Sequence, residues 1–160
     1  MTVNKKDNKI QKKKSPSQEE GGKLFSEVVE IKRVAKKTKG GNKISFTALI
    51  VAGDRNGRVG VALGHGSDVL SAINQGRKLA EKRLTPIKRK GQTIAHDILI
   101  KRGAAKLLLK PAPPGSGIIA SQALKFIMEA GGIRDISVKV LGTNNKTNNV
   151  YTAWEALKED

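Results

Sequence analysis

The sequence lacks cysteine, has few aromatic residues and contains no long apolar run. Without cysteine, the chain can form no disulfide, thiolate zinc site or cysteine nucleophile, which suits a reducing compartment. Aromatic residues make up only 3% of the chain, so an aliphatic core is expected and a base-stacking platform for single strands is disfavoured. No run approaches the ~18 apolar residues of a membrane span, and the N-terminus lacks the apolar segment of a secretory signal. We therefore expect no membrane association.

Acidic residues are also scarce, with 14 against 31 basic ones and a net charge of +17. Residues 1–24 carry 7 basic and 3 acidic groups, and residues 25–110 carry 19 and 6. The remaining 50 residues carry 5 of each sign and are neutral. This distribution indicates a polyanionic partner bound mainly by the first two thirds of the chain. Membrane-surface binding is the competing interpretation, but it requires a basic amphipathic helix with exposed aromatic residues.

Composition and periodicity divide the chain into three parts. Residues 1–23 are polar and basic and predict a disordered tail, either a solubilising segment or a loose RNA-binding arm. Residues 24–88 predict an RNA-binding domain of three antiparallel strands near 28–34, 44–51 and 59–63, followed by a helix over 67–84. Residues 89–160 predict a ββαβα domain, with strands near 94–101, 105–110 and 136–140 and helices over 118–130 and from Thr147 or Asn148 onward. The expected fold class is α+β.

The first candidate site is the basic turn KKTKGGNKISF, where four lysines surround a Gly-Gly pair. Four like charges without an acidic neighbour are costly unless a partner screens them, and glycines let a backbone approach a phosphate closely. A solvated charged turn is the alternative. The predicted contacts in and around this turn are Lys32, Arg33, Lys36, Lys37, Lys39, Gly40, Gly41, Asn42 and Lys43.

A second basic turn and a basic linker extend the candidate surface. Asn-Gly in GDRNGRVG is a strong signal for a short hairpin, and it brings two arginines to the tip. Strands and a helix with basic turns are the arrangement by which double-stranded RNA binders recognise shape. The predicted contacts in these segments are Arg55, Asn56, Arg58, His65, Lys88 and Arg89.

A glycine loop offers a weaker functional signal. Gly115 to Ala120 matches the form G-x-G-x-x-A, with Asp135 twenty residues beyond. That aspartate precedes its strand instead of ending one, so the dinucleotide interpretation fails in context, although one anion at the helix N-terminus remains an alternative. Neither His65 nor His96 has a carboxylate at metal-ligand spacing. We predict no metal, no cofactor and no enzymatic activity.

Two ordered blocks, KGGNKISFTALIVAGDRNGRVGVALG and PAPPGSGIIA, resemble the small-subunit ribosomal protein five family of bacterial or organellar type. The resemblance runs from about Val28 to Leu157. It implies a double-stranded-RNA-binding-like N-terminal domain and a C-terminal domain with a left-handed βαβ crossover. It also implies a structural protein of the cytoplasmic or organellar ribosome that binds ribosomal RNA at the head–body junction and contributes to assembly and decoding accuracy.

The same resemblance implies contacts with ribosomal proteins four and eight and proximity to messenger RNA entry. It also implies that the turn from Lys36 to Lys43 is the loop where spectinomycin resistance changes arise. The chain departs from the family pattern at six positions. These departures are Asn42 for arginine, Arg55 for glycine, His65 for lysine, Leu70 for proline, Lys146 for proline and Tyr151 for arginine. A free double-stranded RNA-binding regulator and a nucleotide-dependent enzyme are the alternative functions.

Overall fold

The computed structural model describes residues 24–158 and contains two four-stranded sheets. The first has the strand order β1-β2-β3-β4, and the second has the order β5-β6-β8-β7. The strands are β1 Phe25–Thr38, β2 Gly41–Gly53, β3 Arg58–Gly66, β4 Thr85–Pro86, β5 Ile98–Arg102, β6 Ala105–Pro111, β7 Ile118–Ile119 and β8 Ile136–Val140. The helices are α1 Val69–Lys82, α2 Gln122–Gly131 and α3 Lys146–Lys158.

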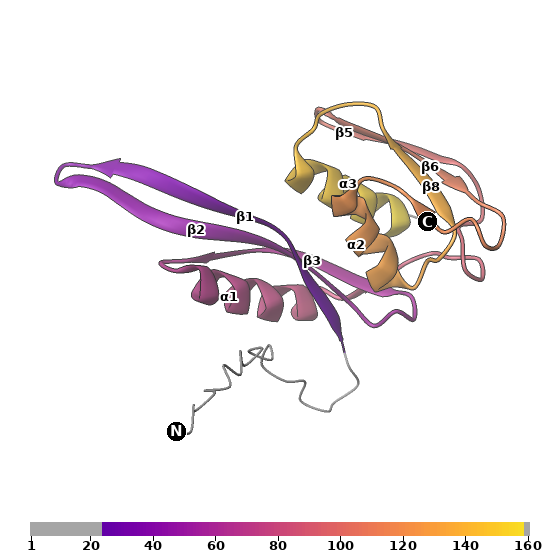
Figure 1. Cartoon of the computed structure of the whole chain (residues 1–160), viewed down its shortest axis with the longest axis horizontal. Helices are drawn as coiled ribbons and strands as arrows, with labels where there is room; N and C mark the ends of the chain where they lie inside the picture. Colours follow the sequence, from indigo (N-terminus) through magenta and orange to yellow (C-terminus); the bar gives the residue numbers. More distant parts are fainter. Residues whose placement is uncertain (1–23, 159–160) are drawn as a thin grey trace, which may run out of the picture.

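The first sheet is buried on both faces where it meets the helices. Side chains alternate across β2, so Ala48 and Ile50 face α1, and Leu49 and Val51 face the second half of the chain. Asp68 caps α1 by accepting a hydrogen bond from the backbone N–H of Ser71. The sheet therefore lies between α1 on one side and the C-terminal elements on the other (Figure 1).

Helices α2 and α3 pack between the two sheets and share one core with both of them (Figure 1). This core joins Leu49 and Val61 of the first sheet to Leu107 of the second and to Ile127 and Leu157 of the helices. Three hydrogen bonds also cross this junction. The Trp154 indole N–H donates to Val59 O at 3.0 Å. The backbone N–H of Lys88 donates to Leu157 O and that of Arg55 to Ala130 O, each at 2.9 Å. The two halves are therefore packed as one body.

The α+β class, with a βββα first unit and a β/α second unit, is confirmed. The division near residue 88 stays a prediction, because the buried core is continuous across it. The βαβ unit is β7–α2–β8, with β7 and β8 parallel neighbours; its left-handed crossover stays an expectation. The tail predicted for residues 1–23 lies outside the described residues.

Several predicted boundaries were wrong. The helix expected over 118–130 begins only at Gln122, because Ile118 and Ile119 pair with Ile136 and Ser137 instead. Its predicted end is confirmed, since Gly132 caps α2 in the left-handed conformation at φ 76°. β5 begins four residues late, so that His96 lies in a bend and not in a strand. The expected turn residue His65 lies within β3, and the short strand β4 was not predicted.

Candidate RNA-binding surface

The distal half of the β1–β2 hairpin forms an arm, defined as residues 31–44, that is exposed on both faces. Figure 1 shows this arm extending beyond the end of α1, away from the C-terminal elements. Antiparallel pairing continues to Thr38 and Gly41, so the arm is a regular two-stranded ribbon. An isolated ribbon is only marginally stable in water, which favours a partner that covers it.

The turn at the tip of the arm is shorter than expected. Lys39 and Gly40 alone connect the strands, and the Thr38 hydroxyl donates to Gly41 O at 2.9 Å. Gly41 has φ 133°, which only glycine adopts readily. Lys36, Lys37, Asn42 and Lys43 are therefore strand residues and not loop residues, which corrects the prediction.

Strand register sorts the cations of the arm onto two faces. Lys36 lies opposite Lys43, Lys32 lies opposite Thr47, and Thr47 lies opposite His65. Residues directly opposite one another share a face, so these residues form one surface, called the basic face below. Its members are Lys32, Lys36, Lys43, Thr47 and His65.

The helix-side face of the arm carries Arg33 and Lys37, because Arg33 pairs with Phe46 of the α1 face and Lys37 with Asn42.

The basic face has little internal charge compensation. Lys32 forms an ion pair with Glu30 at 3.3 Å. Within residues 24–158, no acidic group forms an ion pair with Lys36, Lys39 or Lys43. Like charges placed directly opposite on two strands destabilise the pair. The facing ammonium groups of Lys36 and Lys43 therefore favour an anion from outside the described chain.

The loop between β2 and β3 is a four-residue turn, Asp54 to Gly57, and not a two-residue Asn-Gly hairpin. Asp54 Oδ1 accepts hydrogen bonds from the backbone N–H groups of Asn56 at 2.8 Å and Arg58 at 3.1 Å. Asp54 Oδ2 accepts from Arg58 Nε at 2.8 Å. Burial raises the pKa of Asp54, but these hydrogen bonds outweigh it, so the pKa lies below its ordinary value of 3.8.

Because the folded-state pKa of Asp54 is lowered, its contribution to stability is present above pH 3.8 and is lost as pH falls below that value. We expect Asp54→Ala to lower the free energy of unfolding by about 1–2 kcal/mol at pH 7. Asp54→Asn keeps an acceptor for the backbone N–H groups and should lose about half as much. Urea unfolding at pH 7 and pH 3 checks this, and equal pH dependence in wild type and Asp54→Asn would contradict it.

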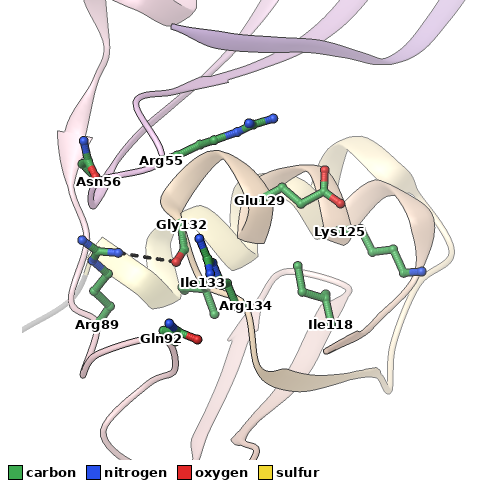
Figure 2. Close-up of a pocket in the computed structure, with 10 residues that line it drawn as sticks. All are labelled: Arg55, Asn56, Arg89, Gln92, Ile118, Lys125, Glu129, Gly132, Ile133 and Arg134. Carbon is green, nitrogen blue, oxygen red and sulfur yellow. Dashed lines mark hydrogen bonds between the residues drawn. The ribbon is translucent and has the colours of Figure 1, made fainter. Parts of the chain in front are cut away.

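A pocket of about 610 Å³ lies where this turn meets α2 and the segment after β4. Figure 2 shows the side chains of Arg55, Arg89, Lys125 and Arg134 around it, with Glu129 as the acidic residue among the labelled ones. The Arg89 guanidinium donates to Gly132 O at 3.4 Å. Arg55 has φ 59°, and its guanidinium lies 4.4 Å from the Phe25 ring centroid. The pocket is therefore cationic.

Most of the predicted site residues fall into two groups, and Arg58, which is paired with Asp54, and Lys88 belong to neither. Arg55, Asn56 and Arg89 line the pocket, whereas the lysines and glycines near the tip lie on the arm. Sequence reasoning missed Gln92, Lys125 and Arg134, which the same pocket brings beside Arg89. No sequence signal groups these residues. Gln92 lies in a linker, and Lys125 and Arg134 lie in a helix and a loop of the neutral segment 111–160. Lys88 is held at the domain junction by its backbone N–H.

The glycine loop binds an internal anion. Asp135 Oδ1 accepts from the backbone N–H groups of Gly115 at 3.1 Å and Gly117 at 3.0 Å. Asp135 is 5% exposed, and α2 begins five residues after Gly117. The alternative that this loop holds an external anion at a helix N-terminus is therefore not supported, because the Asp135 carboxyl group occupies its donors.

Other classes of site are not supported within residues 24–158. No group of three or more His, Asp or Glu side chains there is arranged to hold a metal ion. None of the described helices has the length and apolar character needed to cross a membrane.

Comparison with known proteins agrees with this architecture. Residues 24–88 match the family model for the N-terminal domain of ribosomal protein S5, and residues 100–159 match the model for its C-terminal domain. The small ribosomal subunit protein uS5 of Syntrophobacter fumaroxidans is 44% identical over 135 residues, which cover 84% of this chain and 81% of the relative. The uS5 protein of Campylobacter jejuni is 46% identical over 134 residues, which cover 83% of this chain and 91% of the relative.

A third relative, the uS5 protein of Chlamydia trachomatis, is 42% identical over 135 residues, covering 84% of this chain and 82% of the relative. These matches confirm the resemblance that the sequence motifs indicated, and they identify structural ribosomal proteins and not enzymes. The chain belongs to the ribosomal protein S5 family of the small ribosomal subunit.

Proposed function

We propose that the arm binds folded ribosomal RNA of the small subunit through its basic face and its turn. As a member of its family, the chain is a structural component of the small subunit, and ribosomal RNA binding is general to that family. The observation that carries the proposal is the arm itself. It projects from the core, is exposed on both faces, and carries facing lysines without acidic partners in residues 24–158.

Phosphate neutralisation is the physical basis of this binding. Each lysine or arginine that meets a phosphate releases condensed counterions, so affinity falls as salt rises. With about six phosphate contacts, the slope of log affinity against log salt is near −4 to −5. The pocket cations Arg55 and Arg89 lie apart from the arm, which comprises residues 31–44. Two separated basic surfaces suit a protein that holds two RNA segments in a fixed relation.

The proposed position of the protein within the small subunit is based on the family resemblance. The proposal includes the head–body junction, the neighbouring ribosomal proteins four and eight, proximity to messenger RNA entry, and contributions to assembly and decoding accuracy. The neutral balance of residues 111–160 supports protein neighbours for that part of the chain, since a polyanion would favour a basic surface.

Reversing the charge at the tip tests the turn. Lys39 lies in the two-residue turn and is exposed, so Lys39→Glu should lower affinity for small-subunit ribosomal RNA roughly tenfold, because an attraction becomes a repulsion. Lys139→Glu makes the same change of net charge on an exposed residue of β8 and should have little effect. Filter binding at fixed salt measures both variants. Equal affinities for wild type and Lys39→Glu would remove the turn from the contact surface.

Co-sedimentation with ribosomal subunits under a salt gradient tests the function as a whole. Stoichiometric migration with the small subunit through moderate salt is expected. A chain that stays at the top of the gradient, yet binds generic duplex RNA, would instead be a free double-stranded RNA-binding regulator.

A further inference from the structure

A second cavity lies at the inner end of the basic face, where β3 meets α3 and the β5–β6 turn. Its volume is about 410 Å³, within the range of small-ligand pockets. One wall is aliphatic, one is aromatic and one carries a guanidinium. The lining residues are Leu63 of β3, Arg102 at the end of β5, Gly103 of the β5–β6 turn, and Thr147, Asn148 and Tyr151 of α3.

The aromatic wall is held in place from behind. The Tyr151 ring meets the Trp154 ring edge-on, with centroids 6.2 Å apart and an interplanar angle of 66°. Trp154 is itself fixed by its hydrogen bond to Val59 O. The Arg102 guanidinium carbon lies 5.7 Å from the Tyr151 centroid, and its Nη1 lies 3.4 Å from Glu155 Oε1. The guanidinium lies over one face of the partly exposed Tyr151 ring, and aromatic rings and guanidinium planes are the surfaces on which proteins stack unpaired RNA bases.

Strand register connects this cavity to the basic face. Leu63 lies opposite Leu49, and the next pair outward on that face is Thr47 and His65. Two residues along a strand advance about 7 Å. Outward from the cavity the face therefore carries Lys32 beside Thr47, then the neutral pair Val34 and Ser45, and then Lys36 beside Lys43.

One acidic residue, Glu30, lies on this path. Its carboxylate lies 3.3 Å from Lys32 Nζ and 3.9 Å from Lys146 Nζ, so its charge is balanced within the chain. The path therefore keeps its cationic character up to the cavity.

We propose that this cavity binds one unpaired nucleobase of RNA, stacked on Tyr151 beside Arg102, while the flanking phosphates follow the basic face. The inference rests on the proposed RNA binding by the arm and adds a preference for a flipped-out base. Thr147 and Asn148 bring a hydroxyl and an amide to the rim, which can pair with the polar edge of a base. A fully paired duplex offers no such base, so it would meet the basic face alone.

The test uses two RNA duplexes of about 16 base pairs, a length that double-stranded RNA-binding domains span. One is fully paired, and the other carries a single unpaired 2-aminopurine nucleotide. The full chain should bind the bulged probe roughly tenfold more tightly than the paired one, because a base stacked on an aromatic side chain adds to the binding of the phosphates. The 2-aminopurine fluorescence should be quenched on binding.

Tyr151→Leu removes the ring but keeps an apolar side chain at this position. It should bring the affinity ratio of the two probes close to one and abolish quenching. Tyr151→Phe keeps the ring and should retain both effects. The thermal midpoints of both variants show whether each is folded.

Three results would overturn the proposal. Equal binding of both probes by wild type would show that the cavity takes no base, while RNA binding by the basic face stands. A preference that survives in folded Tyr151→Leu would locate the base elsewhere. Failure of wild type to bind either probe would remove both this inference and the proposed RNA binding.

Discussion

Replacing Gly64 with alanine is expected to lower the free energy of unfolding by at least about 3 kcal/mol. Gly64 lies in β3 directly under α1, and a Cβ there would overlap Ala72 O and Gly76 N and lie 2.7 Å from Gly76 Cα. These are backbone atoms of a helix, which cannot rotate away as a side chain can. Overpacking a core with a single methyl group commonly costs about 1–3 kcal/mol, and a clash with backbone lies at or beyond that upper end.

The close approach at Gly64 is also what holds α1 on the sheet. The core between them consists of small side chains, mainly Ala48, Ala62, Ala72 and Ala80 around Ile50. Such a thin interface retains its contacts only while the two backbones stay close together. Lifting α1 to admit a methyl group would therefore loosen every contact in this cluster.

Gly40→Ala is the matched control, because no atom lies within 4 Å of the added methyl group and Gly40 does not need a left-handed backbone. Its unfolding free energy should stay within about 0.5 kcal/mol of wild type. Urea denaturation of both variants provides the measurement. Equal stability of Gly64→Ala and Gly40→Ala would mean that α1 does not pack on β3 as described.

Local sequence patterns correctly predicted the elements that depend on the burial or the conformation of nearby residues. Phe46, Ala48 and Ile50 take alternate positions in β2 and together form the face that packs on α1. Ser45 and Thr47 begin the other face, which continues into the equally buried Leu49 and Val51. Gly132 ends α2 because glycine adopts the left-handed conformation without strain. In both cases the determining interaction lies within a few residues.

Features set by distant partners could not be predicted in this way. Ile118 and Ile119 have an apolar pattern that suits a helix, yet they pair with β8 residues eighteen positions away. Asp135 was considered as a cofactor ligand, whereas it satisfies the glycine loop that precedes it. Arg55 and Arg134 line the same cationic pocket only because the two halves of the chain share one core.

The exposure of the arm could not be predicted from the sequence either. Ile31, Val34 and Ile44 read as strand residues with a buried face, and they do form strands. In the structure they are 42%, 40% and 40% exposed, because the ribbon continues beyond α1 on the side of Ile31 and Ile44, and beyond the C-terminal elements on the side of Val34. The sequence alone identified the positive charge of the turn. It did not show that β1 and β2 both extend beyond the core and hold this charge away from it.

Reversing both lysines of the facing pair, as Lys36→Glu/Lys43→Glu, is expected to weaken binding to small-subunit ribosomal RNA by at least 100-fold. Each ammonium near a phosphate gains about 1 kcal/mol in water, and reversal turns that gain into a similar penalty. Two reversals therefore amount to about 4 kcal/mol, and screening by salt reduces this toward 3. Filter binding at several salt concentrations measures the loss.

The double variant separates binding from folding, because Lys36 and Lys43 remain a like-charged cross-strand pair after both are changed. Its thermal midpoint should match wild type. Lys101→Glu/Lys106→Glu is the matched control, since these two exposed lysines also lie directly opposite one another, on β5 and β6. The control makes the same change of net charge away from the arm and should retain most of the affinity. If both double variants lose affinity equally, the RNA responds to total charge, and the arm is not its specific contact.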